Sequence, residues 1–190
     1  MRPSEAPGAV RSSTAFSAII VLGLCAVLGR PSEAAVPTEV SLFTITKSEN
    51  RNFVQYGIRL DAQCVPVPAN PVYAYWRMLE QGPSSTAPLL GRELRAYGMA
   101  NQQIVSPVTP GAVAAVRVVL AAVPDRPVLV EIWRTGDGAC RALPSTRIAG
   151  APAHLFNVYV RLKWPLNVDY FLLQGWAMDG THRVEEKVSV

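Results

Sequence analysis

Apolar and polar residues alternate along the segment from His154 to Trp164. The apolar positions are Phe156, Val158, Val160 and Leu162, and the intervening positions are Asn157, Tyr159, Arg161 and Lys163. Successive side chains of a strand point to opposite faces of a sheet. This period of two therefore predicts a strand with one buried face and one face in water.

Short apolar runs separated by turn-forming residues fill the rest of the second half of the chain. They predict strands over 115–122, 128–134, 139–148, 168–178 and 183–190, with turns at 124–127, 135–138, 149–152, 165–167 and 179–180. Turns this short permit only antiparallel neighbours, so the six C-terminal strands form a meander. Apolar residues on both faces of 168–178 predict a strand covered on both sides. The alternation in 183–190 is typical of an edge strand.

The first half of the chain predicts three strands and one helix. The strands are Leu42–Lys47, a second strand with Val54, Tyr56, Ile58 and Leu60 on its inner face, and Val72–Leu79. The segment 89–97 is the helical candidate, with Gly98 placed to cap its C-terminus, and we expect it to cover one end or face of the sheet. The fold class is therefore all-β, with about nine mostly antiparallel strands arranged as a barrel or a two-sheet sandwich. The uninterrupted meander favours the barrel.

The first 34 residues have the three parts of a secretory signal peptide. Arg2 and Arg11 give a positive start, residues 15–29 form an uncharged apolar run, and small residues precede a cleavage site after Ala34. The run is short for a membrane span, and Leu24 is too large for the lipoprotein alternative at Cys25. We predict a cleaved leader over 1–34, a single β domain over 35–190, and export to the periplasm or outside the cell.

Export changes the interpretation of the cysteines. Cys25 leaves with the leader, so the exported chain keeps Cys64 and Cys140 in a compartment where thiols oxidise. A disulfide between them is the natural pairing, and two free buried thiols are the alternative.

Charge and motifs exclude several classes of function. The formal net charge of +4 comes without a Lys/Arg cluster, so we expect no nucleic-acid partner. Strands with Arg and Lys on their polar faces and no aromatic girdles predict no stable membrane insertion. His154 and His182 lack metal-ligand spacing, and no nucleophile elbow or phosphate-binding glycine loop occurs. We therefore predict no metal, no cofactor and no catalytic set.

One strand carries the best candidate for a binding surface. Tyr73, Tyr75 and Arg77 fall on one face of the third strand, where aromatic area and a guanidinium could bind a ligand. Asn52 and Gln55 stand at the entry of the preceding strand and complete the candidate set. The alternative is structural: aromatic residues fill a core, and the side-chain amides satisfy backbone groups.

Four motifs resemble a known family. They are NRNFVQYGIRLDA, PVYAYWRMLEQG, RELRAYGM and VDYFLLQGW, in this order between about Leu42 and Val188. Together they resemble DUF4833, a bacterial family of exported single-domain proteins with no established activity. The resemblance implies no cofactor and no catalytic residue. The cysteine pair is not part of its pattern, which implies a local stabilising cross-link.

We expect a binding or interaction module whose partner is a small molecule or an envelope or extracellular component. A lipocalin-like carrier of an apolar small molecule is the alternative, suggested by the meander and by aromatic residues in several strands. A hydrolase of envelope or extracellular polymers is a third hypothesis, and whether the protein is an enzyme stays open.

Overall fold

The structure is a computed structural model and describes residues 36–47, 50–163 and 167–189. The predicted leader, Trp164 and Val190 lie outside these residues. Within them the elements are β1 Thr38–Lys47, β2 Phe53–Leu60, β3 Val72–Arg77, β4 Thr86–Pro88, α1 Arg92–Tyr97, β5 Met99–Val105, β6 Ala114–Leu120, β7 Val123–Arg134, β8 Cys140–Ile148, β9 Ala151–Lys163, β10 Asn167–Ala177 and β11 Arg183–Ser189.

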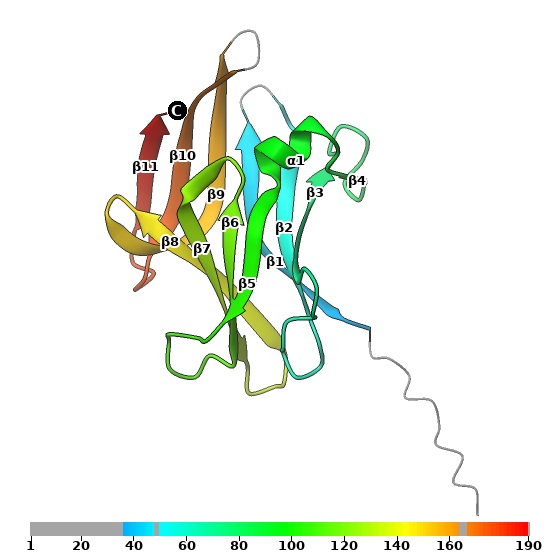
Figure 1. Cartoon of the computed structure of the whole chain (residues 1–190), viewed down its shortest axis with the longest axis vertical. Coiled ribbons are helices and arrows are strands. Elements are labelled where there is room, and N and C mark those ends of the chain that lie inside the picture. The colour runs from blue at the N-terminus through cyan, green and yellow to red at the C-terminus, as the bar shows by residue number, and fades with distance from the viewer. Residues whose placement is uncertain (1–35, 48–49, 164–166, 190) are drawn as a thin grey trace, which may run out of the picture. The chain divides into compact units, whose positions relative to one another are not determined.

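All strands belong to one sheet, which curls into an open half-barrel (Figure 1). The order is β4-β3-β2-β1-β9-β8-β7-β6-β5, and β10 pairs with β9 and β11. The predicted all-β class and the six-strand meander are confirmed, because β6 to β11 pair antiparallel in succession. Of the two predicted architectures, this single curved sheet is nearer to the barrel.

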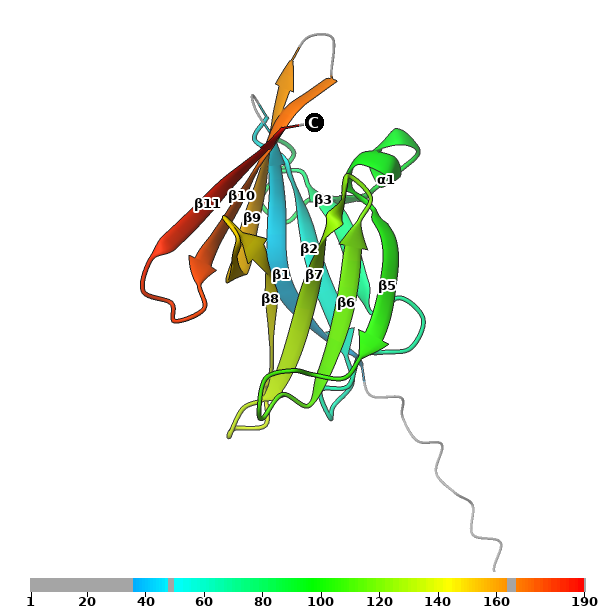
Figure 2. The same cartoon turned by 60° about the vertical axis from the view of Figure 1, so that its left-hand side comes forward.

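Strand β9 holds the two halves of the sheet together. One of its edges pairs with β8 near its start, from Ala151 to His154, and then in parallel with β1, from Asn157 to Val160. Its other edge pairs with β10. Figure 2 shows β10 and β11 diverging from strands β5 to β7. The N-terminal strands are therefore joined to the meander through its fourth strand.

The concave side of the sheet contains the hydrophobic core. The predicted inner face of β2 is confirmed, since Val54, Tyr56, Ile58 and Leu60 are fully buried. Their partners across the core lie in the meander and include Val116, Val118, Val130 and Ile132. Alternation along each strand directs these side chains inward and leaves the convex face partly polar.

Three predictions about the meander are wrong. Residues Pro124–Pro127, predicted as a turn, lie inside β7, and the tight turn falls earlier, at residues 121–122. The β6–β7 register shifts at this point, so that Leu120 pairs with Val123 and Val118 pairs with Val128. Proline cannot donate to a strand ladder, so the chain bulges out of the pairing here while staying extended.

The second error concerns Phe156, which was predicted to face the core with Val158. A register shift between Gln174 and Gly175 changes the alternation, so that Leu155 is buried instead. Phe156 packs against Trp176, which is 38% exposed. The third error concerns β10, which was predicted to be buried on both sides: Phe171, Leu173 and Gly175 are buried, but Leu172, Gln174 and Trp176 on the other face are only partly buried or exposed.

The sequence did not predict two of the strands or the exact bounds of the helix. The strands β4 and β5 flank α1, which begins at Arg92 because Gly91 adopts a positive φ of 50°. Leu89 is buried before the helix begins. The predicted role of Gly98 is confirmed, since its N–H donates to the carbonyl of Leu94 at 2.9 Å. In the described residues, no helix is long and apolar enough to cross a bilayer.

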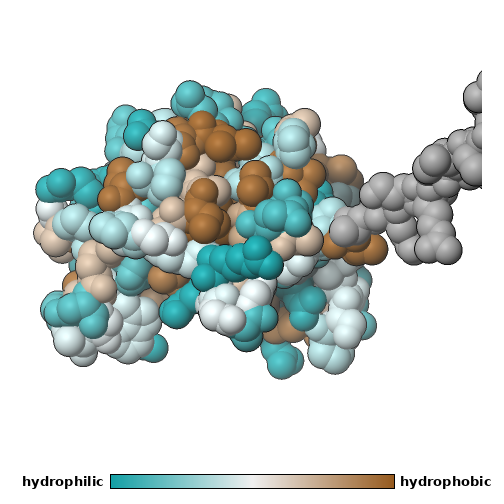
Figure 3. Space-filling view, turned by 90° about the horizontal axis from the view of Figure 1, so that it is seen from below, coloured by the Kyte–Doolittle hydropathy of each residue, from teal (hydrophilic) through white to brown (hydrophobic). Residues whose placement is uncertain are grey.

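A disulfide joins Cys64 to Cys140, as predicted. Cys64 lies in the loop after β2, and Cys140 begins β8. The bridge therefore connects the loop after β2 with the start of β8, and these two strands are not neighbours in the sheet. It lies at the end of the sheet opposite α1, where Figure 3 shows apolar side chains reaching the surface among polar ones.

A side chain joins the two open edges of the half-barrel. Gln102 of β5 accepts a hydrogen bond from the backbone N–H of Val72 at 2.9 Å. Its amide nitrogen donates to the Val72 carbonyl and to the Asn70 side chain, both at 3.2 Å. The amide thus takes the place of a strand that would pair with this part of β3.

Replacing Gln102 with alanine is expected to lower the free energy of unfolding by about 1 to 3 kcal/mol, because the polar groups of Val72 lose their partner. Urea denaturation of both proteins measures the difference. The control is Gln103→Ala, because Gln103 is exposed on the other face of β5 and should change stability little. Equal losses for the two variants would contradict a joining role for Gln102.

Candidate functional site

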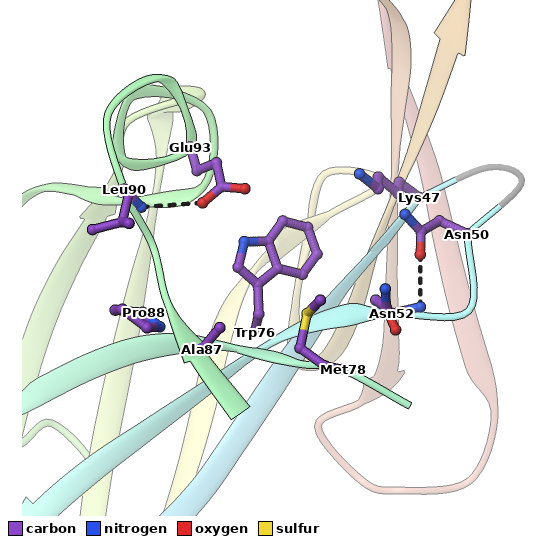
Figure 4. Close-up of a pocket in the computed structure, with 9 residues that line it drawn as sticks. All are labelled: Lys47, Asn50, Asn52, Trp76, Met78, Ala87, Pro88, Leu90 and Glu93. Atoms are coloured by element: carbon purple, nitrogen blue, oxygen red, sulfur yellow. Dashed lines mark hydrogen bonds between the residues drawn. The ribbon is translucent and has the colours of Figure 1, made fainter. Parts of the chain in front are cut away.

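A hollow of about 370 Å³ lies at the end of the concave face, beside α1 (Figure 4). We call it the Trp76 pocket. Its lining residues are Lys47, Asn50, Asn52, Trp76, Met78, Ala87, Pro88, Leu90 and Glu93. Residues at the ends of four strands, β1 to β4, and residues at the start of α1 therefore meet at one place.

Strand alternation explains how these side chains reach the pocket. Trp76 continues the inner face of β3, and Met78 follows it at the same period. Asn52 precedes Val54 on the inner face of β2, and Lys47 follows Ile45 on that of β1. The core thus ends in polar residues at the mouth of the half-barrel.

Trp76 is the central residue of the pocket and is only 7% exposed. Its indole Nε1 is buried and has no hydrogen-bond partner among the described residues. Figure 4 shows this nitrogen on the side of the ring turned toward Leu90 and Glu93. The Lys47 ammonium lies 5.0 Å from the ring centroid, and Tyr97 packs edge-on at 5.5 Å.

The polar residues of the pocket are held by hydrogen bonds to backbone. Glu93 accepts one from the N–H of Leu90 at 3.1 Å. The side-chain carbonyl oxygen of Asn50 accepts a hydrogen bond from the backbone N–H of Asn52 at 2.7 Å. The side-chain carbonyl oxygen of Asn52 accepts one from the backbone N–H of Glu80 at 3.3 Å. Each side chain keeps hydrogen-bonding capacity on its remaining atoms.

Two tyrosines support the pocket from behind as neutral phenols. Burial raises the pKa of Tyr97, and the nearby Glu93 carboxylate raises it further. Burial also raises the pKa of Tyr56, whose hydroxyl donates to the carbonyl of Tyr97. This hydrogen bond ties the end of α1 to the inner face of β2.

A second hollow, of about 470 Å³, lies along β3 and contains two of the predicted residues, Tyr73 and Tyr75. Their rings stack 5.9 Å apart, and the Arg59 guanidinium lies 4.3 Å from the Tyr73 centroid. Arg59 also pairs with Glu39 at 3.2 Å. Burial, followed by the hydrogen bond to Glu39, raises the pKa of Tyr73. Tyr73 therefore has its ring and hydrogen-bond partners within the protein itself.

Of the other predicted site residues, Gln55 pairs across the strands with Tyr75 and Arg77 follows Tyr75 on the same face of β3. Arg77 donates to the carbonyl of Pro83 at 2.7 Å, and the Gln55 amide donates to the carbonyls of Phe43 and Tyr56. Asn52 lies on the opposite face, in the Trp76 pocket. The predicted set is therefore divided between two faces of the sheet.

Sequence reasoning did not select Lys47, Trp76 and Glu93 as site residues. Alternation along residues 72–79 places Trp76 on the face opposite Tyr73 and Tyr75, and Trp76 is buried with the core residues. The missing signal was the burial of an indole N–H without a partner, which only packing reveals.

No group of three or more His, Cys, Asp or Glu residues that could hold a metal occurs in the part of the chain that the structure describes. His182 contacts the Thr181 hydroxyl at 2.9 Å and is exposed.

A family model described as a domain of unknown function, DUF4833, matches residues 43–187. The chain belongs to the DUF4833 family. The match spans the four motifs that suggested this family and runs from β1 to β11 of the DUF4833 sheet. No curated protein and no solved structure matches the chain.

Proposed function

We propose that this DUF4833 domain is a binding module that holds a small molecule in the Trp76 pocket. The observation that supports this proposal most directly is the buried indole N–H of Trp76, which has no hydrogen-bond partner among the described residues. Leaving such a donor unsatisfied costs about 1 to 3 kcal/mol, and native interiors seldom do so. A ligand acceptor at this position would recover that cost.

The composition of the pocket supports the proposal. Small-molecule sites are concave, mostly apolar and hold a few polar groups that orient the ligand, in volumes of about 300 to 1,000 Å³. The Trp76 pocket has apolar walls from Met78, Pro88 and Leu90. Lys47 and Glu93 lie on opposite sides of the indole (Figure 4).

Helix α1 supplies a route by which a ligand reaches the N–H. The helix has six residues, none of them buried, and no side-chain cap at its N-terminus. Short helices with few buried contacts open at low free-energy cost. A small outward shift of the segment carrying Leu90 and Glu93 would uncover Nε1.

We also propose that the protein works outside the cytoplasm, in the periplasm or beyond the cell. The disulfide between Cys64 and Cys140 supports this compartment, because such bonds persist where thiols oxidise.

Protein-observed NMR with a diverse fragment library tests the pocket. The indole N–H signal of Trp76, assigned by its absence from the Trp76→Phe spectrum, should shift when fragments bind. Trp76→Phe keeps an aromatic ring, smaller than the indole, but removes the donor, so affinity should fall about tenfold, the value of one hydrogen bond. The control is Trp176→Phe on the convex face, which should bind as the wild type does.

The Trp76 signal can also be assigned by exclusion from the Trp133→Phe, Trp164→Phe and Trp176→Phe spectra, so the wild-type shift remains a valid test even if Trp76→Phe unfolds the protein. A library that leaves the Trp76 signal unmoved, or fragments that shift only other tryptophans, would refute the proposed site.

A further inference from the structure

We infer that the ligand of the Trp76 pocket is a neutral, hydroxyl-rich molecule of the size of a mono- or disaccharide. This inference rests on the proposed function and adds the chemistry of the ligand. It follows from the hydrogen-bonding capacity left at the two ends of the pocket.

One end of the pocket pairs a donor with an acceptor that do not bond to each other. The Trp76 indole can only donate, and its nitrogen has no partner among the described residues. The Glu93 carboxylate can only accept, and one of its oxygens already receives the N–H of Leu90. Within the described ranges, no cation pairs with Glu93.

A ligand group between these two must accept one hydrogen bond and donate another. A hydroxyl does both. An ammonium group cannot accept from the indole, and a carboxylate cannot donate to Glu93 and would be repelled by it. This end of the pocket therefore selects a hydroxyl over either charged group.

The other end presents donors. The side-chain carbonyl oxygens of Asn50 and Asn52 each accept a hydrogen bond from a backbone N–H, which leaves their side-chain amide nitrogens to donate to a ligand. The Lys47 ammonium adds further donors beside them. Hydroxyl or ring oxygens of the same ligand would accept these hydrogen bonds.

The lining of the pocket suits a ligand whose carbon skeleton is uncharged and not planar. Lys47 and Glu93 carry opposite charges, so the pocket favours a ligand without net charge. Lys47 covers one face of the indole, and Tyr97 packs against the ring. Once the segment carrying Leu90 and Glu93 shifts outward, the ring offers its buried N–H edge rather than a free face on which a planar aromatic ligand would stack.

The test is an NMR titration of the full chain with two sets of probes. One set contains glucose, galactose, N-acetylglucosamine, maltose and cellobiose, and the other contains indole, octanoate and cyclohexanol. We expect at least one saccharide to shift the Trp76 indole signal in a saturable way, and to bind at least tenfold more tightly than any probe of the second set.

Three variants change the hydrogen-bonding pattern without removing structural contacts. Asn52→Asp and Asn50→Asp keep the oxygen that accepts from backbone but replace the donor, and Glu93→Gln replaces the free acceptor with a donor. Each should weaken saccharide binding about tenfold. The matched control is Asp125→Asn, which removes an exposed charge outside the pocket and should leave affinity unchanged.

The outcomes separate the two proposals. If probes of the second set shift Trp76 and no saccharide does, the hydroxyl-rich class is wrong and the binding site stands. If a saccharide binds without moving the Trp76 signal, or binds the three variants as it binds the wild type, the assignment to this pocket is overturned. If no probe and no library fragment moves the signal, both proposals fail.

Discussion

Replacing Cys64 and Cys140 together by alanine is expected to lower the free energy of unfolding by about 4 kcal/mol. The bridge closes a loop with a sequence separation of 76 residues. In the chain-entropy model, a cross-link of this length stabilises the fold by about 4 to 5 kcal/mol, because it restricts the unfolded chain. Alanine avoids placing a new polar group at Cys64, which is fully buried.

Urea denaturation of the oxidised wild type and of the double variant measures this loss. Wild-type protein unfolded in the presence of a reductant is the control, and it should match the variant if the cross-link itself carries the stability. A difference below about 1 kcal/mol between oxidised wild type and variant would contradict the prediction, because it is far below the loop-closure value.

Replacing Glu131 with alanine is expected to cost about 2 to 3 kcal/mol of stability. Glu131 is 4% exposed on β7 and accepts hydrogen bonds from the N–H groups of Val108 and Thr109 and from the Thr109 hydroxyl. These bonds hold the loop between β5 and β6 against the sheet. Hydrogen bonds to a charged group are stronger than neutral ones, and their loss frees the loop.

The same contacts make stability depend on pH. Burial alone would raise the pKa of Glu131, but the hydrogen bonds from Thr109 and Val108, with the nearby His154, lower it below its ordinary value. The folded state therefore binds the proton less well than the unfolded chain. The stability from Glu131 is complete above about pH 5 and declines as the pH falls through the lowered pKa.

Thermal unfolding from pH 7 to pH 3 checks this dependence. The wild type should lose stability more steeply below about pH 5 than Glu131→Gln, which keeps the shape of the side chain without its titration. Parallel curves for the two proteins would show that the Glu131 charge does not stabilise the loop.

Much of the sheet was predictable because strand periodicity is a local property. The inner face of β2 and the succession of β6 to β11 follow from alternation and turn residues within each segment. The pairing of Cys64 with Cys140 followed from the number of cysteines that an exported chain would keep. None of these inferences required knowledge of which distant segments touch.

The errors occur where long-range pairing overrides local pattern. Phe156 leaves the core because β9 shifts register against β10, and Pro124–Pro127 stays extended as a bulge because Val123 and Val128 on either side of it both pair with β6. The strand β5 has no buried residue, and its Gln102 side chain satisfies backbone groups of Val72 on β3, a strand that β5 does not pair with. Local alternation carries no information about such partners.

By itself, the sequence determined the all-β class, the meander, the cross-link and membership of the DUF4833 family. Only the tertiary structure decided that β1 joins β9 in parallel and that Tyr73 and Asn52 lie on opposite faces. It also brought Lys47, Trp76 and Glu93 to one pocket. The physical reason is that alternation depends on consecutive residues, whereas a pocket depends on how strand ends distant in sequence pack together.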